Sequence, residues 1–208
     1  LQHRALPGYT PEQIPGGATF SKFTPPANTG LGFLELVSDA DILIMADPTD
    51  KNNDGISGVP NWKVVPDYVT IPSNAISNNG KYICRFGKKA SIFNLLQQTA
   101  TAYNQDIGIT SSFEPADVYS GNENDPEVSD NTVLNVVAYL QTLKAPIQRD
   151  QDDPDVIKGE DVFISIGCEN CHKQTLRTGF SMVEALSDKE FHPFTDLLLH
   201  DMGPGLDD

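Results

Sequence analysis

Apolar residues recur at helical spacing in four parts of the chain. In residues 31–47 they form two short groups, and Ser38 and Asp39 between them are typical helix caps, so we expect two short helices there. Longer helices are expected at 88–106, 131–146 and 155–166. The apolar residues expected to face the core from these longer helices are Ile92, Phe93, Leu96, Ala100, Tyr103, Val133, Val136, Val137, Leu140, Leu143, Val156, Val162, Phe163 and Ile166.

The remaining pattern favours irregular structure. Residues 1–30 are rich in Pro and Gly, which indicates coil. Two β-leaning runs, WKVVPDYVTIP and KYICRFG, flank Asn79-Gly80, a dipeptide typical of a tight hairpin turn. The pattern therefore predicts a mainly α fold with long irregular loops and one small β-hairpin.

Two of the three cysteines stand in the stretch SIGCENCHKQ, where Cys168 and Cys171 are three residues apart and His172 follows at once. One helical turn separates the two thiols, so both can bond vinyl groups of one porphyrin while His172 ligates the iron. A chain of this composition gives only on the order of 10⁻³ chance matches to the pattern. The motif therefore predicts a covalently attached haem c.

A zinc site and a dithiol redox centre are the alternatives for this motif. Zinc needs two further ligands, and Cys84, His192 and His200 are spaced unlike those of finger-like sites. A thioredoxin-like centre follows a strand, whereas the residues before Cys168 have a helical pattern. Both alternatives fit the sequence less well than haem attachment.

Length and charge narrow the function classes. The 208 residues are enough for one or two domains, and the formal net charge is −15. No run of Lys and Arg could neutralise phosphates, so we expect no nucleic acid partner. We also expect no membrane span, because no apolar stretch is long enough. Covalent haem attachment takes place outside the cytoplasm, so we expect a periplasmic or exported protein.

The order of the expected elements predicts parts of two domains. A cytochrome c domain runs from a helix through the haem motif and loops to a distal ligand and a closing helix. Here the helix at 131–146 resembles a closing element, yet it precedes the motif. We therefore expect residues 1–147 to be the C-terminal part of a first cytochrome c-like domain with a long insertion. Residues 148–208 would be the N-terminal part of a second, which carries the motif.

Several segments resemble the bacterial di-haem oxidoreductase family, also called thiol oxidoreductases and related to di-haem cytochrome c peroxidases. The segments are LGFLELVSDADILIMADPTDKNNDGISGVPN, RFGKKAS, QQTATAYNQDIGITS, GCENCH and FTDLLLHDMGPGL, and LLLHDMGPGL beside GCENCH is the most specific of them. The resemblance implies two haems on two c-type domains and peroxide-linked or other redox chemistry. The family carries an earlier CxxCH motif that this chain lacks, so the resemblance implies a fragment.

Met202 is the candidate for the second axial ligand of the iron. It lies in the stretch HDMGPG, beyond His172 and in an expected loop. A thioether in that position could close the sixth coordination site and would raise the potential of the iron. Packing of Met202 against the core is the alternative, and His200 and Met182 are weaker candidates for the ligand.

The stretch DKNNDGISG follows the first half of a calcium loop. It offers side-chain oxygens from Asp50, Asn52 and Asp54, and then the carbonyl oxygen of Ile56. Asn61 stands where such a loop needs a bidentate Glu. An Asx-rich surface turn is therefore the alternative to a calcium site.

Together these features predict a fragment of a periplasmic di-haem oxidoreductase, peroxidase-like in its chemistry. The haem held by Cys168, Cys171 and His172 would exchange electrons with a catalytic haem. The expected partners are a redox partner protein or a small electron donor, with peroxide as a further candidate. Two other functions fit the sequence: a simple electron-transfer cytochrome c domain without catalysis, and a calcium-stiffened interaction scaffold formed by residues 1–145.

Overall fold

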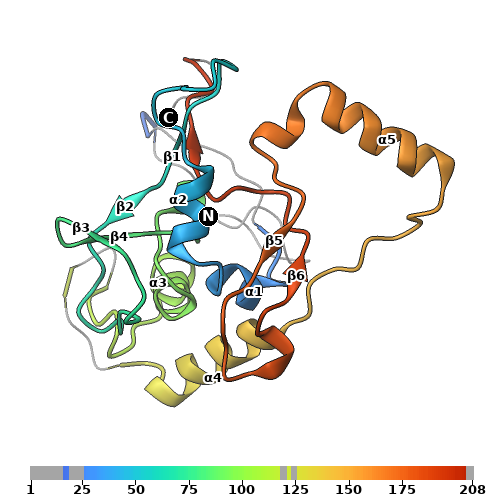
Figure 1. The fold of residues 1–208 in the computed structure, drawn as a ribbon. Coiled ribbons are helices and arrows are strands. Elements are labelled where there is room, and N and C mark those ends of the chain that lie inside the picture. The colour runs from blue at the N-terminus through green and yellow to red at the C-terminus, as the bar shows by residue number, and fades with distance from the viewer. Residues whose placement is uncertain (1–15, 19–25, 118–120, 123–125, 205–208) are drawn as a thin grey trace.

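The computed structural model describes residues 16–18, 26–117, 121–122 and 126–204 (Figure 1). Within this part, the α-helices are α1 (Leu31–Glu35), α2 (Asp39–Met45), α3 (Leu95–Ile107), α4 (Asp130–Thr142) and α5 (Pro154–Ser165). The 3-10 helices are η1 (Lys88–Ala90), η2 (Cys168–Asn170) and η3 (Glu184–Leu186). The strands are β1 (Gly58–Val59), β2 (Trp62–Lys63), β3 (Ser77–Asn78), β4 (Lys81–Ile83), β5 (Leu176–Arg177), β6 (Glu190–Phe191) and β7 (Leu199–His200).

The expectation of a mainly α, cytochrome c-like fold is wrong. Of the described residues, 34% are helical and 11% lie in several antiparallel sheets, and much of the remainder is loop. Strands β1, β5, β6 and β7 escaped prediction because each has only two residues, too few to show the period-2 alternation of a strand. In addition, β1 pairs with β7, which lies far away in the sequence.

Helices α1, α3 and α4 pack together through one apolar cluster whose buried residues include Leu95 and Val137. Gly32 of α1 approaches the backbone of Gln141 in α4, where no side chain would fit. Glu35, at the end of α1, joins all three helices. Its Oε1 accepts a hydrogen bond from the backbone N–H of Leu95 at 2.8 Å, and its Oε2 accepts one from Gln141 Nε2 at 2.6 Å.

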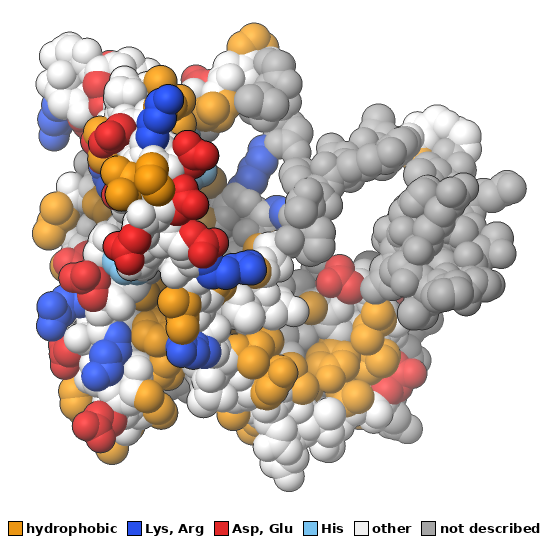
Figure 2. Space-filling model, turned by 90° about the vertical axis from the view of Figure 1, so that its right-hand side faces the viewer, with side chains coloured by type: hydrophobic (Ala, Val, Ile, Leu, Met, Phe, Trp, Pro, Cys, Tyr) orange, Lys and Arg blue, Asp and Glu red, His pale blue; other side chains and the backbone are white. Residues whose placement is uncertain are grey.

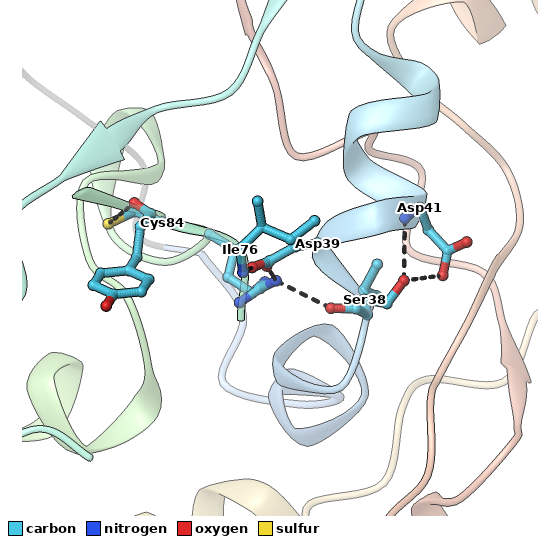
Figure 3. Close-up of polar contacts among 8 residues, drawn as sticks. Ser38, Asp39, Asp41, Ile76 and Cys84 are labelled. Atoms are coloured by element: carbon cyan, nitrogen blue, oxygen red, sulfur yellow. Dashed lines mark hydrogen bonds and ion pairs between the residues drawn. The ribbon is translucent and has the colours of Figure 1, made fainter. Parts of the chain in front are cut away.

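The start of α2 is fixed by polar contacts that Figure 3 shows in close-up. Ser38 caps the helix, because its hydroxyl accepts a hydrogen bond from the backbone N–H of Asp41 at 3.1 Å. The buried Asp39 accepts a hydrogen bond from the backbone N–H of Ile76 at 2.7 Å and pairs with Arg85 at 2.5 Å. The cap predicted at Ser38 and the division into two helices are confirmed.

The hairpin predicted at Asn79-Gly80 is also confirmed. It joins β3 to β4, and both turn residues have positive φ, 52° for Asn79 and 75° for Gly80. These angles suit a tight two-residue turn between antiparallel strands. Strand β2 pairs with the other edge of β4, which makes a three-stranded sheet.

The C-terminal segment packs on the N-terminal one. Strands β5 and β6 form an antiparallel pair, and their residues Leu176 and Phe191 share a buried cluster with Val37, Ile42 and Ile83. Residues from both sides of position 147 therefore contribute to one core. The division into domains at 147 and 148 stays a prediction.

Two expected helices differ from the observed ones. Helix α3 begins at Leu95 because Asn94 caps it, so Ile92 and Phe93 precede the helix. Helix α5 occupies nearly the expected residues, but none of them is buried, although Val162 and Ile166 were expected inside. Figure 1 shows α5 at the outer edge of the molecule.

Replacing Gly32 with Ala is expected to lower the free energy of unfolding by about 2 kcal/mol or more. The new carbon would lie 2.0 Å from the carbonyl oxygen of Gln141, so the backbones of α1 and α4 would have to separate. Urea unfolding measures the loss. Gly159→Ala is the matched control: a Cβ at Gly159 meets nothing within 4 Å, so stability should stay equal or rise. Equal losses in both variants would contradict the close approach.

Candidate functional site

The end of α5 places the two thiols and the imidazole of the CxxCH motif on one turn. Gly167, with φ of 81°, ends the helix, and η2 begins at Cys168. The backbone N–H of His172 donates to the carbonyl oxygen of Cys168 at 2.9 Å, which keeps the motif compact. Both cysteines are free thiols of intermediate exposure. The structure thus brings together the three residues that the sequence predicted as one site.

The orientation of His172 is set by a residue that the sequence did not indicate. Its Nδ1 lies 2.9 Å from the carbonyl oxygen of Phe194. A carbonyl oxygen can only accept, so Nδ1 carries the hydrogen and, in the neutral ring, Nε2 keeps a free lone pair. A histidine that donates through one nitrogen and presents the other is the usual arrangement of a metal ligand. Phe194 itself has positive φ, 53°, which turns its carbonyl toward the ring.

Aromatic and aliphatic side chains surround the motif. The Phe163 ring of α5 makes an edge contact with Phe194 at 5.7 Å between centroids, and its centroid is 6.4 Å from that of His172. Beside them is a pocket of about 190 Å³, and Gly159 and Val156 of α5 line it together with Phe163 and Phe194. Most of the exposed pocket surface is apolar, and the pocket reaches the motif through Phe163 and Phe194, the two rings that lie next to His172.

The outer surface of α5 is also apolar in places. Figure 2 shows the molecule from the side on which α5 projects, with hydrophobic side chains between charged ones. Ile157, Val162 and Ile164 are 42–49% exposed. An apolar surface of this kind beside a pair of thiols and a histidine with a free Nε2 fits a flat apolar group such as a porphyrin. The donor set and its surroundings are thus suited to haem.

The Cys171 thiol lies in an acidic environment. Burial raises the pKa of Cys171 above its ordinary value, and the carboxylates of Asp196 and Asp54 raise it further. Asp54 belongs to the loop proposed for calcium, so this loop lies close enough to the CxxCH motif to influence it. This proximity is not predictable from the sequence, because more than a hundred residues separate Asp54 from Cys171.

The candidates for the distal ligand are not joined to His172 by any described contact. Met202 follows β7 and is 64% exposed. His200 has both ring nitrogens engaged: Nδ1 lies 2.9 Å from the Ser57 carbonyl oxygen, and Nε2 lies 2.9 Å from Asp196 Oδ2. Of the two, only Met202 has a side chain free for another contact.

The loop proposed for calcium is held by its own hydrogen bonds. The carboxylate of Asp50 accepts from the backbone N–H groups of Asp54 and Gly55, and Asp54 accepts from that of Ile56. The side-chain oxygen of Asn52 also accepts from the N–H of Asp54. These hydrogen bonds form Asx turns, and they are sufficient to explain the conformation of the loop. A calcium site formed by Asp50, Asn52, Asp54 and the Ile56 carbonyl stays a prediction.

The zinc alternative lacks further ligands near the motif. Cys84 is 1% exposed and lies in a separate apolar cluster with Val69 and Phe93. Burial raises the pKa of its thiol to about 11, which disfavours the thiolate that zinc binds. In the described ranges, no group of three or more His, Cys, Asp or Glu side chains is arranged to hold a metal ion.

Asp54→Asn is expected to lower the pKa of Cys171, because it removes one negative charge that disfavours the thiolate. At a fixed pH near 8, where more of the thiol is then ionised, it should react faster with iodoacetamide. The Cys168→Ser background leaves Cys171 as the accessible thiol. Asp50→Asn is the matched control from the same loop, since Asp50 is not among the groups that shift this pKa. Equal rates in the two variants would contradict the proximity of Asp54.

None of the helices in the described part combines the length and apolar composition needed to cross a membrane. Among curated proteins and solved structures, none shows significant similarity to the chain. A family model described as "Di-haem oxidoreductase, putative peroxidase" matches residues 22–208, which is most of the chain. This match agrees with the resemblance carried by GCENCH and LLLHDMGPGL. The chain therefore belongs to the di-haem oxidoreductase family.

Proposed function

We propose that the chain is part of a periplasmic di-haem oxidoreductase and exchanges electrons through one covalently bound haem c. The observation that carries the proposal is the contact between His172 Nδ1 and the Phe194 carbonyl oxygen, which leaves Nε2 free beside two unpaired thiols. The family match supports haem binding in general. A location outside the cytoplasm is part of the proposal, because thioether attachment of haem takes place there.

In this proposal each residue of the site has one role. Cys168 and Cys171 would hold the haem through thioether bonds to its two vinyl groups. His172 would provide Nε2 to the iron, and the Phe194 carbonyl oxygen holds the ring in the tautomer that this requires. Phe163 and Phe194 provide apolar surface and limit access of water. When bound, the haem supplies one-electron redox chemistry, and the apolar surroundings tune its potential.

We further propose Met202 as the second axial ligand. Met202 is exposed and follows β7 in a segment without regular structure, so its thioether is open to another contact. His200 is the poorer candidate, since binding iron would cost it a hydrogen bond to Asp196 or Ser57. Thioether ligation would raise the potential and favour electron transfer at this haem over direct binding of an oxidant.

Peroxide is the oxidant that we propose for the complete enzyme. Two electrons and two protons convert hydrogen peroxide into two molecules of water, and a redox partner protein or a small donor would supply the electrons one at a time. The alternative is an electron-transfer protein without turnover. The two differ in peroxide-dependent oxidation of a reduced donor, which only the enzyme would catalyse.

The central test is the mass of the chain after export from a host that attaches haem to CxxCH motifs. The intact protein is expected to gain the mass of one porphyrin, since Cys168 and Cys171 form one attachment motif. The double variant Cys168→Ala, Cys171→Ala should lose this gain, whereas Cys84→Ala should keep it because Cys84 lies in another cluster. A colourless exported protein, or one that holds zinc on these sulfurs, would overturn the proposed function.

The axial ligand is tested by absorbance of the oxidised, haem-loaded protein. Met202→Ala is expected to abolish the weak band typical of thioether-to-iron ligation and to lower the reduction potential. Met182→Ala is the matched control, because Met182 is also an exposed methionine, at 91% exposure, whose thioether is open to another contact. If the band survives in Met202→Ala and vanishes in Met182→Ala, the axial ligand is Met182.

A further inference from the structure

A surface groove lies between α2 and the β5–β6 hairpin. Strand β5 of this hairpin follows the CxxCH motif in the sequence. The groove has a volume of about 390 Å³. Its lining begins at Thr175, three residues beyond His172, and continues along β5. The opposite wall comes from α2, where Ile44 and Asp41 line it. The groove therefore borders the segment that we assign to haem attachment.

The groove is lined by one highly exposed aliphatic side chain and by several carboxylates. Ile44 is 81% exposed, so most of its side chain is available for contact with a partner. Three carboxylates line the same groove, those of Asp41, Asp188 and Glu190, against the single guanidinium of Arg177. Interfaces between proteins combine apolar and charged side chains in this way.

Both walls are held in place by hydrogen bonds. In the hairpin, the buried Thr178 donates through its hydroxyl to the Leu186 carbonyl oxygen at 2.7 Å and accepts from the Lys189 N–H at 2.7 Å. On the other wall, the Ser38 cap and the Asp39–Arg85 pair fix α2. Because little ordering is required on binding, such a surface is preorganised for a partner.

We propose that this groove, which is lined by Ile44 and by the carboxylates of Asp41, Asp188 and Glu190, is the docking site of a small electron-carrier protein with a basic face. The inference rests on the proposed function, which requires a redox partner near the haem. The charge of the chain supports this choice of partner: a net −15 attracts a basic protein over distance, and the local carboxylates orient it. The aliphatic Ile44 then contacts the apolar centre of the partner's surface.

Calorimetric titration of the exported protein with a strongly basic small cytochrome c, at low ionic strength, tests the proposal. The variant Asp188→Asn, Glu190→Lys is expected to weaken binding about tenfold, and Ile44→Ser about threefold. Asn at position 188 suits the positive φ of 52° found there. The matched charge control is Asp67→Asn, Asp106→Lys, two exposed sites outside the groove. The matched apolar control is Val64→Ser, at a residue that is 72% exposed.

Groove variants that weaken binding while their controls do not would support the docking site. If the groove and control variants weaken binding equally, the attraction is only the net charge, and the proposal is overturned; absence of binding by the unaltered protein overturns it too. The mass of each protein is measured first. A missing porphyrin would refute the proposed function, whereas the titration still reports on the groove, because calorimetry does not depend on iron.

Discussion

A buried ion pair between Asp39 and Arg85 holds the centre of this structure together. Their side chains are only 5% and 7% exposed, so water solvates neither charge well, and each charge is stabilised mainly by the other. Removing one member of such a pair typically costs about 3–5 kcal/mol. The pair fixes the first turn of α2 to the end of β4, and Asp39 also binds the N–H of Ile76. Three segments that are distant in sequence thus meet at one carboxylate.

The CxxCH motif depends on this arrangement through packing. Val37, Ile42 and Ile83, which flank the ion pair, form the apolar surface on which β5 and β6 lie through Leu176 and Phe191. The β5–β6 hairpin begins shortly after the CxxCH motif, and Phe194 follows it by three residues. The position of the Phe194 carbonyl, and with it the tautomer of His172, is therefore a tertiary property. The local motif supplies His172, while a core formed by distant residues orients its ring.

The sequence predicted those features whose causes are local. Ser38 caps α2 through a contact three residues away, and Asn79-Gly80 turns the chain by its own backbone preference. The spacing of Cys168, Cys171 and His172 likewise lies within one turn. The Phe194 carbonyl carries no sequence signal, because every residue has one. The pairing of β1 with β7 and the proximity of Asp54 to Cys171 depend on the path of the whole chain, and the two-residue strands left no pattern to detect.

The stability of helix α5 would depend on whether a haem is attached next to it. Its apolar residues predict burial, yet none of them is buried within the described structure. What supports the helix is local: Asp153 accepts from the N–H of Asp155 at 2.8 Å, and Pro154 occupies the first turn. Beyond these caps, the ring contact between Phe163 and Phe194 ties the helix to the rest of the chain, and a helix of 12 residues with so little support is marginal in water. A porphyrin bonded to Cys168 and Cys171 would cover the face that carries Phe163 and supply the missing apolar contact. Attachment would thus stabilise the segment that carries the motif, and the exposed turn keeps both thiols accessible beforehand.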